Sequence, residues 1–440
     1  MTHPGGDPAT SARTPSPDLG VYWRFYWPLA ITGAIGVVAV QFQNGALARY
    51  PEGTQELAIF ALAQGVFALF RAATDFIPQL VTRFARGAEA RRVTLRYVIG
   101  LCAGCAVAIE LIGQSSLSAA AISRFFGVEG YFLLRVLAYL CLLAPLMLVE
   151  GVRMACVGML VQRHLTGRVT FLNVVFLVAV ALSLVIALLA ELPATIALIG
   201  AQGIGSGLHA ALGVLLVRRS LRSEGASDDV PDVARLTRFF VPVATTGLMF
   251  ALTRPLLYAF VARTPEGVVS IAALRIAFDF TFFFQQASNQ FRHFFVAFGL
   301  DDLAGKRRFM GRVTVGITAL MLLVAATPLG EWLLRAGLGV DGDVLERARQ
   351  VILVMCLLPL VIIVRNYYHG ILMVAEQTAG MATGGILRVL LVAGASAAFA
   401  AAGLLDHLLA AWIMLAGFGI ETLEVLRRVR EARRRGLVPA

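Results

Sequence analysis

The sequence has little charge for its length. Of its 440 residues, 15% are charged and 58% are hydrophobic, whereas soluble domains carry about 25% charged residues. A soluble globular protein is therefore excluded. Lysine is nearly absent, since Lys306 is the only lysine among 38 basic residues. The net charge of +11 comes mainly from arginine, and on so apolar a chain this excess indicates membrane topology rather than a nucleic-acid partner.

Cysteines are few, and motifs for catalysis are missing. The five cysteines all lie in apolar stretches, which predicts buried thiols and no structural disulfide. Cys102 and Cys105 alone do not complete a four-ligand metal site, so neither a metal nor another cofactor is expected. The sequence contains no Walker motif and no catalytic constellation, so the protein is not expected to hydrolyse ATP or to be an enzyme.

One stretch of the sequence occurs twice. Residues 24–53 and 238–267 align without a gap at an offset of 214 and share 11 identities in 30 positions, whereas chance would give about two or three in so apolar a chain. Each copy contains an apolar run of about 24 residues, long enough at about 36 Å to cross a bilayer core of about 30 Å. Pro28 and Pro242 fall in the first turn, where a missing N–H is tolerated. The chain is therefore predicted to consist of two related halves.

The hydrophobic pattern predicts an all-α integral membrane protein with about twelve transmembrane helices in two parallel, pseudo-symmetric six-helix lobes. The predicted helices cover residues 25–48, 56–82, 97–119, 131–160, 169–190, 194–217, 239–262, 268–299, 309–335, 344–374, 379–402 and 405–426. The predicted divisions are a disordered cytoplasmic tail at 1–22, an N-terminal lobe at 23–217, a cytoplasmic linker at 218–237, a C-terminal lobe at 238–428 and a basic cytoplasmic tail at 429–440.

The distribution of basic residues predicts the orientation. With the N-terminus inside, 24 basic residues fall on the cytoplasmic side and seven on the opposite side. This bias predicts a multi-pass inner (plasma) membrane protein with both termini in the cytoplasm. Because each half has an even number of helices, the halves are parallel repeats, an arrangement typical of alternating-access transporters with a site between the halves.

Seven arginines remain within the predicted spans. They are Arg71, Arg153, Arg254, Arg275, Arg292, Arg365 and Arg388. A charge in mid-membrane costs a few kcal/mol and needs a partner or a wet cavity. Fewer acids share that depth, namely Asp75, Glu110, Glu150 and Asp279. Since guanidinium groups hold carboxylate or phosphate in a bidentate manner, the excess favours an anionic small-molecule substrate. Snorkelling to the headgroups or structural ion pairing is the alternative, above all for Arg153 and Arg292.

Three acids are candidates for coupling to H⁺ or Na⁺, namely Asp75, Glu150 and Asp279. Coupling is not required, because an inside-negative potential favours anion exit by about 2.3 kcal/mol per charge per 100 mV. Arg153 and Arg365 are related by the repeat at an offset of 212, which suits a bivalent anion.

Short stretches throughout the chain resemble one known family. They are RFYWPLAIT at 24–32 with Asn44 downstream, Thr74–Phe76, Arg254–Pro255, Phe291–Phe298, IVRNYYHGILM from Ile363 and ILRVLLVAGAS from Ile386. In these the chain resembles the progressive ankylosis protein family of membrane anion exporters, within the multidrug/oligosaccharidyl-lipid/polysaccharide (MOP) exporter superfamily. The resemblance implies a MATE-like fold and export of citrate, pyrophosphate or a nucleotide such as ATP. It places Arg254, Arg292, Arg365 and Arg388 at basic positions of the family's pattern and Glu150 at an acidic one.

The leading interpretation is a secondary transporter that exports a polyvalent anion across the lipid bilayer by alternating access between the lobes. The candidate substrate-binding residues are Arg365, Arg388, Arg254, Arg292, Arg153, Arg71 and Asn44. Two alternatives stay open. The first is a MOP-type flippase for a lipid-linked saccharide, whose pyrophosphate would also favour arginines. The second is a cation-coupled multidrug exporter, for which acids should dominate the cavity.

Overall fold

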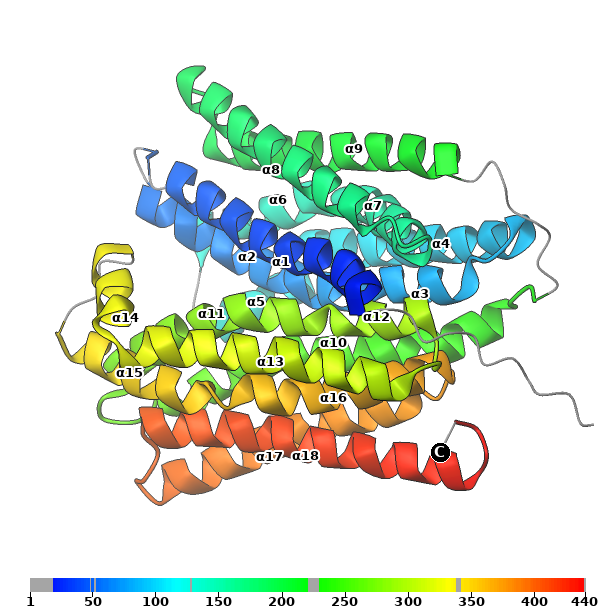
Figure 1. Cartoon of the computed structure of the whole chain (residues 1–440). Coiled ribbons are helices and arrows are strands. Elements are labelled where there is room, and N and C mark those ends of the chain that lie inside the picture. Colours follow the sequence, from blue (N-terminus) through cyan, green and yellow to red (C-terminus); the bar gives the residue numbers. More distant parts are fainter. Residues whose placement is uncertain are drawn as a thin grey trace, which may run out of the picture.

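The computed structural model describes residues 19–47, 49–50, 53–126, 129–220, 229–337 and 342–438, which form helices and short connections (Figure 1). The predicted tail up to residue 18, the linker segment 221–228 and residues 439–440 lie outside this part of the chain.

The N-terminal lobe consists of nine described helices. They are α1 (Leu19–Leu47), α2 (Gly53–Thr74), α3 (Ile77–Phe84), α4 (Ala88–Gln114), α5 (Ser116–Phe126), α6 (Gly130–Leu143), α7 (Leu146–Gln162), α8 (Thr166–Leu189) and α9 (Ala194–Ser220). The C-terminal lobe consists of α10 (Val233–Val261), α11 (Gly267–Asn289), α12 (Phe291–Phe298), α13 (Leu303–Ala326), α14 (Pro328–Trp332), the π-helix η1 (Leu333–Gly337), α15 (Gly342–Met355), α16 (Leu358–Val374), α17 (Ala379–Ala401) and α18 (His407–Arg434).

The helix limits reproduce the sequence repeat. Helices α1 and α10 begin and end at positions that differ by 214 residues, and so do α3 and α12. Helices α7 and α16 are both 17 residues long, at an offset of 212. Pro28 lies inside α1, and Pro242 and Pro255 lie inside α10, which stays continuous. The prediction that Pro28 and Pro242 fall in the first turn was therefore wrong, because each helix begins nine residues before its proline.

The predicted spans correspond to long helices or to helices with a break. Within the described residues, α4, α8, α9, α10, α13, α17 and α18 are each long and apolar enough to cross a membrane. The pairs α6/α7 and α15/α16 qualify as spans bent by 43° and 40°. Pro145 and Pro359 lie at these breaks, where proline removes a helix hydrogen bond. Helices α1, α2/α3 and α11/α12 occupy the other three predicted ranges. The protein is a multi-pass membrane protein.

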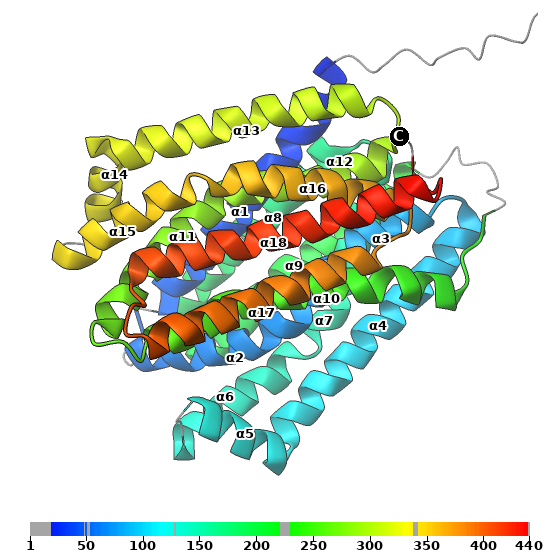
Figure 2. The same cartoon turned by 90° about the horizontal axis from the view of Figure 1, so that it is seen from below.

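Several helix limits differ from the prediction. Helix α1 begins at Leu19, inside the predicted tail, and Tyr22 is fully buried. Helix α18 continues to Arg434, eight residues beyond the predicted end, because charged residues at the membrane surface extend a helix without extending its apolar pattern. The short helices α5, α14 and η1 were not predicted as separate elements. Figure 2 shows α5 and α14 away from the end of the bundle where α1 begins.

The two lobes share one hydrophobic core at the end of the bundle where α1 begins. This shared core includes Tyr22, Phe25, Tyr26, Phe291, Phe294, Phe295 and Phe309. The rings of Tyr26 and Phe291 stack across the lobes with centroids 4.8 Å apart. At the opposite end each lobe has a core of its own, around Tyr139 in one and Met321 in the other. The lobes are therefore joined at one end and packed separately at the other.

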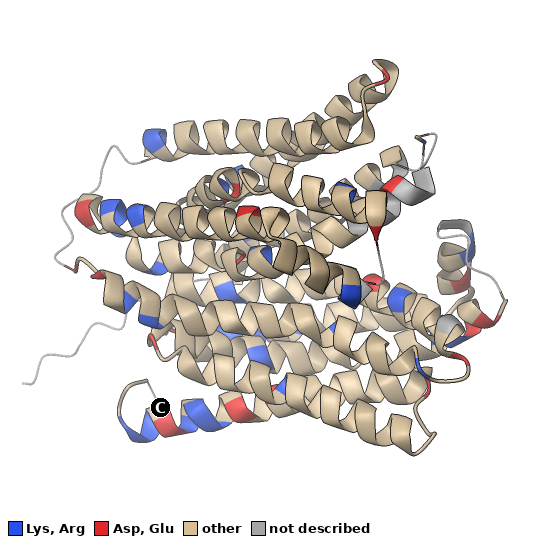
Figure 3. Ribbon diagram, turned by 180° about the vertical axis from the view of Figure 1, so that it is seen from behind, with Lys and Arg blue, Asp and Glu red and all other residues tan. Residues whose placement is uncertain are grey.

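The joined end is also the arginine-rich end. The starts of α4 and α10 and the end of α18 lie there (Figure 2), and Figure 3 shows basic residues gathered at the start of α4 and the end of α18. By the distribution of basic residues, this end is expected to face the cytoplasm.

Two repeat-related glycines form matching crossings between the lobes. A Cβ added to Gly33 of α1 would lie 2.7 Å from the Cβ of Gln286 in α11. A Cβ added to Gly247 of α10 would collide with the carbonyl oxygen of Ala72 and come within 2.7 Å of the Phe76 ring. Each glycine thus lets the first helix of its lobe approach the second helix of the other lobe. This close approach explains why glycine occurs at both positions of the repeat.

An ion-pair cluster links the lobes at the joined end. Glu376, which follows α16, accepts a hydrogen bond of 2.7 Å from Arg83 of α3. The same carboxylate accepts bonds of 2.8 and 2.7 Å from Arg235 at the start of α10. Arg83 is thereby tied to the C-terminal lobe through a partly buried carboxylate.

This cluster should stabilise the conformation in which the lobes are joined at this end. We expect a coupling energy of about 1 kcal/mol between Arg83 and Glu376 in a double-mutant cycle of R83Q and E376Q. Thermal unfolding of the purified protein measures it. The exposed pair Arg92–Glu89 within α4 is the control, and its coupling should be close to zero. A coupling no larger than that of the control would show that Glu376 does not link the lobes.

Candidate functional site

A cavity of about 310 Å³ lies between the lobes. The N-terminal lobe supplies most of its wall from α1, α2, α3, α7, α8 and α9, and the C-terminal lobe supplies residues of α11 and α12. The wall is rich in amides and hydroxyl groups. These residues are Thr32, Gln43, Gln79, Asn173, Gln202, Ser206, Gln286, Asn289 and Gln290. Such side chains in mid-membrane hydrogen-bond between helices or line a wet path, and here they line a cavity.

Two arginines of the cavity are paired with acids that lie close to them in the sequence. Arg153 and Glu150 lie one turn apart on α7 and form a buried bidentate ion pair, with Nε and Oε2 2.7 Å apart. Arg71 and Asp75 lie near the break between α2 and α3, where Arg71 Nε is 3.8 Å from the Asp75 carboxylate. The Arg153 guanidinium also lies over the Phe176 ring, 5.1 Å from its centroid.

The third cavity arginine, Arg292 of α12, has no such acid. Its Nε donates to the carbonyl oxygen of Asn289 at 3.2 Å, and its guanidinium lies 4.6 Å from the centroid of the Phe76 ring. Among the described residues no carboxylate forms an ion pair with it. The charged residues lining the cavity are thus three arginines and two acids. One net positive charge results, and Arg292 carries it.

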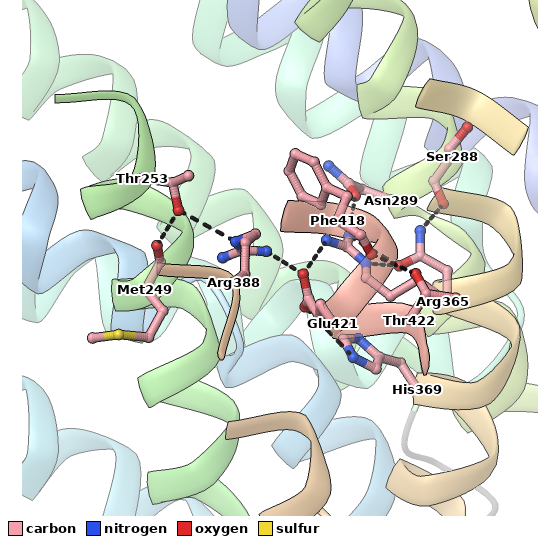
Figure 4. A network of polar contacts seen from close by, with 11 residues as sticks. Met249, Thr253, Ser288, Asn289, Arg365, His369, Arg388, Phe418, Glu421 and Thr422 are labelled. Carbon is pink, nitrogen blue, oxygen red and sulfur yellow. Dashed lines mark hydrogen bonds and ion pairs between the residues drawn. The ribbon is translucent and has the colours of Figure 1, made fainter. Parts of the chain in front are cut away.

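A second charged cluster lies in the C-terminal lobe (Figure 4). Glu421 of α18 is fully buried and pairs with Arg388 of α17. Its Oε2 atom also lies 3.5 Å from Nη1 of Arg365 in α16, and Oε1 lies 3.8 Å from Nε2 of His369. Two guanidinium groups thus share one carboxylate, which leaves a second net positive charge beside the cavity.

Aromatic rings and hydroxyl groups complete the surroundings of this cluster. Arg388 donates to the Thr253 hydroxyl at 3.2 Å, and its guanidinium lies 4.9 Å from the Phe418 ring centroid. The Arg365 guanidinium also lies over the Phe418 ring, 5.4 Å from its centroid. In this apolar setting an unpaired charge would cost several kcal/mol, so Glu421 holds both arginines in place.

Asn289 connects the two clusters. Its side chain lines the cavity and its Oδ1 accepts a hydrogen bond of 3.5 Å from Nη2 of Arg365. Asn366, next to Arg365, donates to the carbonyl oxygen of Ser288 at 2.7 Å. A change in the position of α11 relative to α16 is thereby coupled to the Arg365 side chain.

The structure brings together some of the predicted site residues and separates others. Arg71, Asp75, Glu150, Arg153 and Arg292 line one cavity. Arg365 and Arg388 lie behind it, in the Glu421 cluster. Although Arg153 and Arg365 each occupy the eighth position of their helices, only Arg153 lines the cavity.

Arg254 lies apart from the main cavity. It pairs with Asp279 at 3.0 Å and donates to the Phe278 carbonyl oxygen at 2.9 Å, beside a pocket of about 20 Å³. Arg275 is exposed. Asn44 belongs to α1, but its side chain is outside the described part of the structure.

Glu421 was missed by the sequence analysis. The predicted last helix ended at residue 426, which put Glu421 only five residues from the end of that helix. In the structure α18 reaches Arg434, so Glu421 lies 13 residues, about 20 Å, before its end. The depth of Glu421 could have been predicted by counting back from the last arginine of the helix instead of from its last apolar residue.

Comparison with known proteins shows the fold. No family model and no curated protein sequence matches the chain. The structure matches the eukaryotic MATE transporter AtDTX14 with a TM-score of 0.72 at 13% identity, over 95% of this chain and 99% of that chain. A MOP superfamily transporter from Pyrococcus furiosus matches with a TM-score of 0.74 at 14% identity, over 95% and 96%. An outward-facing multidrug-resistance MATE transporter matches with a TM-score of 0.69 at 15% identity, over 95% of both chains. The chain has the fold of the MATE transporters.

Proposed function

We propose that the protein is a secondary transporter that exports a polyvalent anion, moving it by alternating access between the two lobes. The observation that carries this proposal is the positive charge of the cavity, where Arg292 has no carboxylate partner among the described residues. A guanidinium group that faces a polar cavity and lacks an acid is suited to hold a carboxylate or phosphate of the substrate. The Glu421 cluster adds a second positive charge next to it.

Two similarities to known proteins bear on the class of substrate. The Pyrococcus furiosus transporter of the same fold was described as having a binding pocket of reverse polarity that suggests a different function, so pockets of different charge occur in this fold. The resemblance of several stretches to the progressive ankylosis family favours citrate, pyrophosphate or ATP as the anion. A multidrug exporter for cations is disfavoured by the excess of arginine over acids in the cavity.

The cavity volume favours a small solute over a lipid-linked saccharide. Ligand sites of drug-sized molecules occupy about 300 to 1,000 Å³, and this cavity, at about 310 Å³, is at the lower limit. A compact di- or tricarboxylate or a pyrophosphate suits this volume better than an oligosaccharide headgroup does.

The direction of transport follows from the proposed topology. With the arginine-rich end in the cytoplasm of a plasma-membrane protein, the joined end of the lobes is the inner end and this conformation faces outward. An inside-negative potential then favours release of the anion to the outside. If transport is coupled to H⁺ or Na⁺, Asp75 and Glu150 are placed to act because they line the cavity. Asp279 lies with Arg254 outside it.

Reconstitution into liposomes tests the proposal. Vesicles loaded with labelled citrate, pyrophosphate or ATP are expected to release one of these anions when they contain the protein. R292Q should slow this release by about 10- to 100-fold, since a hydrogen bond to a charged group contributes about 1.5 to 3 kcal/mol. R275Q removes an exposed arginine of the neighbouring helix α11 and should leave release unchanged.

Three outcomes would contradict the proposal. If none of these anions is released by correctly folded protein, the substrate is of another class, and a fluorescent lipid-linked saccharide and a cationic dye are the next probes. If R292Q transports as fast as the unmodified protein, Arg292 does not bind the substrate. If R275Q impairs transport as much as R292Q does, the effect comes from net charge rather than from the cavity.

A further inference from the structure

A second cleft lies on the outside of the C-terminal lobe, away from the main cavity. It has a volume of about 330 Å³ and is formed by α13, α16 and the end of α18. Figure 2 shows α13, α16 and α18 running along the same side of the bundle. The residues lining the cleft are Arg307, Met310, Gly311, Ile363, Val364, Tyr367, Tyr368 and Arg433.

The polar and apolar residues of this cleft occupy different depths. Arg307 lies in the first turns of α13 and Arg433 at the end of α18, so both are at the arginine-rich end of the bundle. Gly311 lies four residues, about 6 Å, further along α13 than Arg307. Val364 lies ten residues, about 15 Å, from the end of α16. Positive charge therefore lies at the level of the headgroups and an apolar wall at the level of the acyl chains.

The charges at the rim of the cleft are not neutralised within it. No carboxylate is among the described residues that line it. The Nε atom of Arg433 is buried and makes no hydrogen bond to a described residue. A buried guanidinium N–H without an acceptor is costly, and an anionic group in the cleft would supply that acceptor.

We propose that this cleft binds an anionic phospholipid of the surrounding bilayer. The phosphate lies between the guanidinium groups of Arg307 and Arg433. One acyl chain extends along Gly311 and Val364, where the wall is apolar and Val364 is 43% exposed. The Tyr367 and Tyr368 rings, which meet edge to face at 5.4 Å, lie between these two levels, as amphipathic rings do at a membrane interface. The inference is independent of the proposed transport function.

Native mass spectrometry of the full-length protein, titrated with phosphatidylglycerol or phosphatidylcholine, tests the proposal. We expect one phosphatidylglycerol to be retained more tightly than phosphatidylcholine. R307Q/R433Q should weaken its binding by about 30-fold, if each arginine contributes about 1 kcal/mol. R308Q/R434Q removes the same charge from exposed neighbours that do not line the cleft, and is expected to weaken binding less than threefold.

A second pair of variants tests the apolar part of the cleft without changing any charge. Gly311 and Gly316 both lie on α13, and a Cβ at either meets no atom within 4 Å. G311F fills the cleft and should reduce phosphatidylglycerol binding at least tenfold, whereas G316F should not. Equal binding of the two lipids, or equal losses in the test and control variants, would overturn the proposal.

Discussion

Replacing Glu421 by glutamine is expected to lower the free energy of unfolding by about 3 to 5 kcal/mol. The carboxylate is fully buried and pairs with both Arg365 and Arg388. A neutral amide leaves two guanidinium groups in an apolar environment without their counter-charge. Thermal or denaturant unfolding of the purified protein in detergent measures this loss.

A matched control lies on the same helix. Glu424 of α18 is also buried, but its partners Arg427 and Arg428 are 57% and 39% exposed. Water solvates these arginines when the pair is broken, so E424Q should cost less than about 1 kcal/mol. E421Q/R388M removes one of the stranded charges and should be more stable than E421Q alone. Equal losses for E421Q and E424Q would show that the buried cluster does not hold the C-terminal lobe together.

Replacing Gly247 by alanine is expected to destabilise the joined conformation, although alanine favours helices. The added Cβ meets the Ala72 carbonyl oxygen and the Phe76 ring of the other lobe. Backbone on that side cannot move away without shifting α2, so overpacking should cost about 1 to 3 kcal/mol. Transport should fall as well, because this crossing adjoins the cavity formed between the lobes.

Gly104 provides the control for this substitution. It is exposed on α4, and a Cβ there meets no atom within 4 Å. G104A should therefore stabilise the protein by up to about 1 kcal/mol, the usual gain of alanine over glycine in a helix. If G247A destabilises the protein and G104A stabilises it, the close crossing of the lobes at Gly247 is the cause of the destabilisation. A stabilising G247A would mean that the lobes do not approach each other at this position.

Much of the fold was predictable because it follows from local apolar runs and from an internal repeat. The alignment of residues 24–53 with 238–267 fixed the equivalence of α1 and α10, and the structure confirms it at both ends. Pro145 and Pro359 lie at two of the helix breaks, where a residue type visible in the sequence accounts for the break. The break between α11 and α12 has no proline, so no local residue type predicted it.

The site was less predictable, because a helix position gives the depth of a side chain but not the element that it faces. Arg153 and Arg365 occupy equivalent positions, yet one lines the cavity and the other pairs with Glu421 of another helix. Asp279 had the right depth for a coupling acid but pairs with Arg254 elsewhere in the lobe. These pairings join residues 25 and 56 positions apart, and only the packing of the helices determines them.

The shared aromatic core has a consequence for leakage. In the proposed transport cycle, ions and water reach the cavity while its other end is open, and the buried rings of Tyr22, Tyr26, Phe291 and Phe294 form the remaining barrier. These side chains are almost fully buried and mainly apolar, so an ion would have to shed its hydration shell to pass between them. Opening that end exposes apolar surface to water at about 25 cal/mol per Å². The packing that joins the lobes thus also prevents ions from leaking across the membrane, and it makes simultaneous opening of both ends rare.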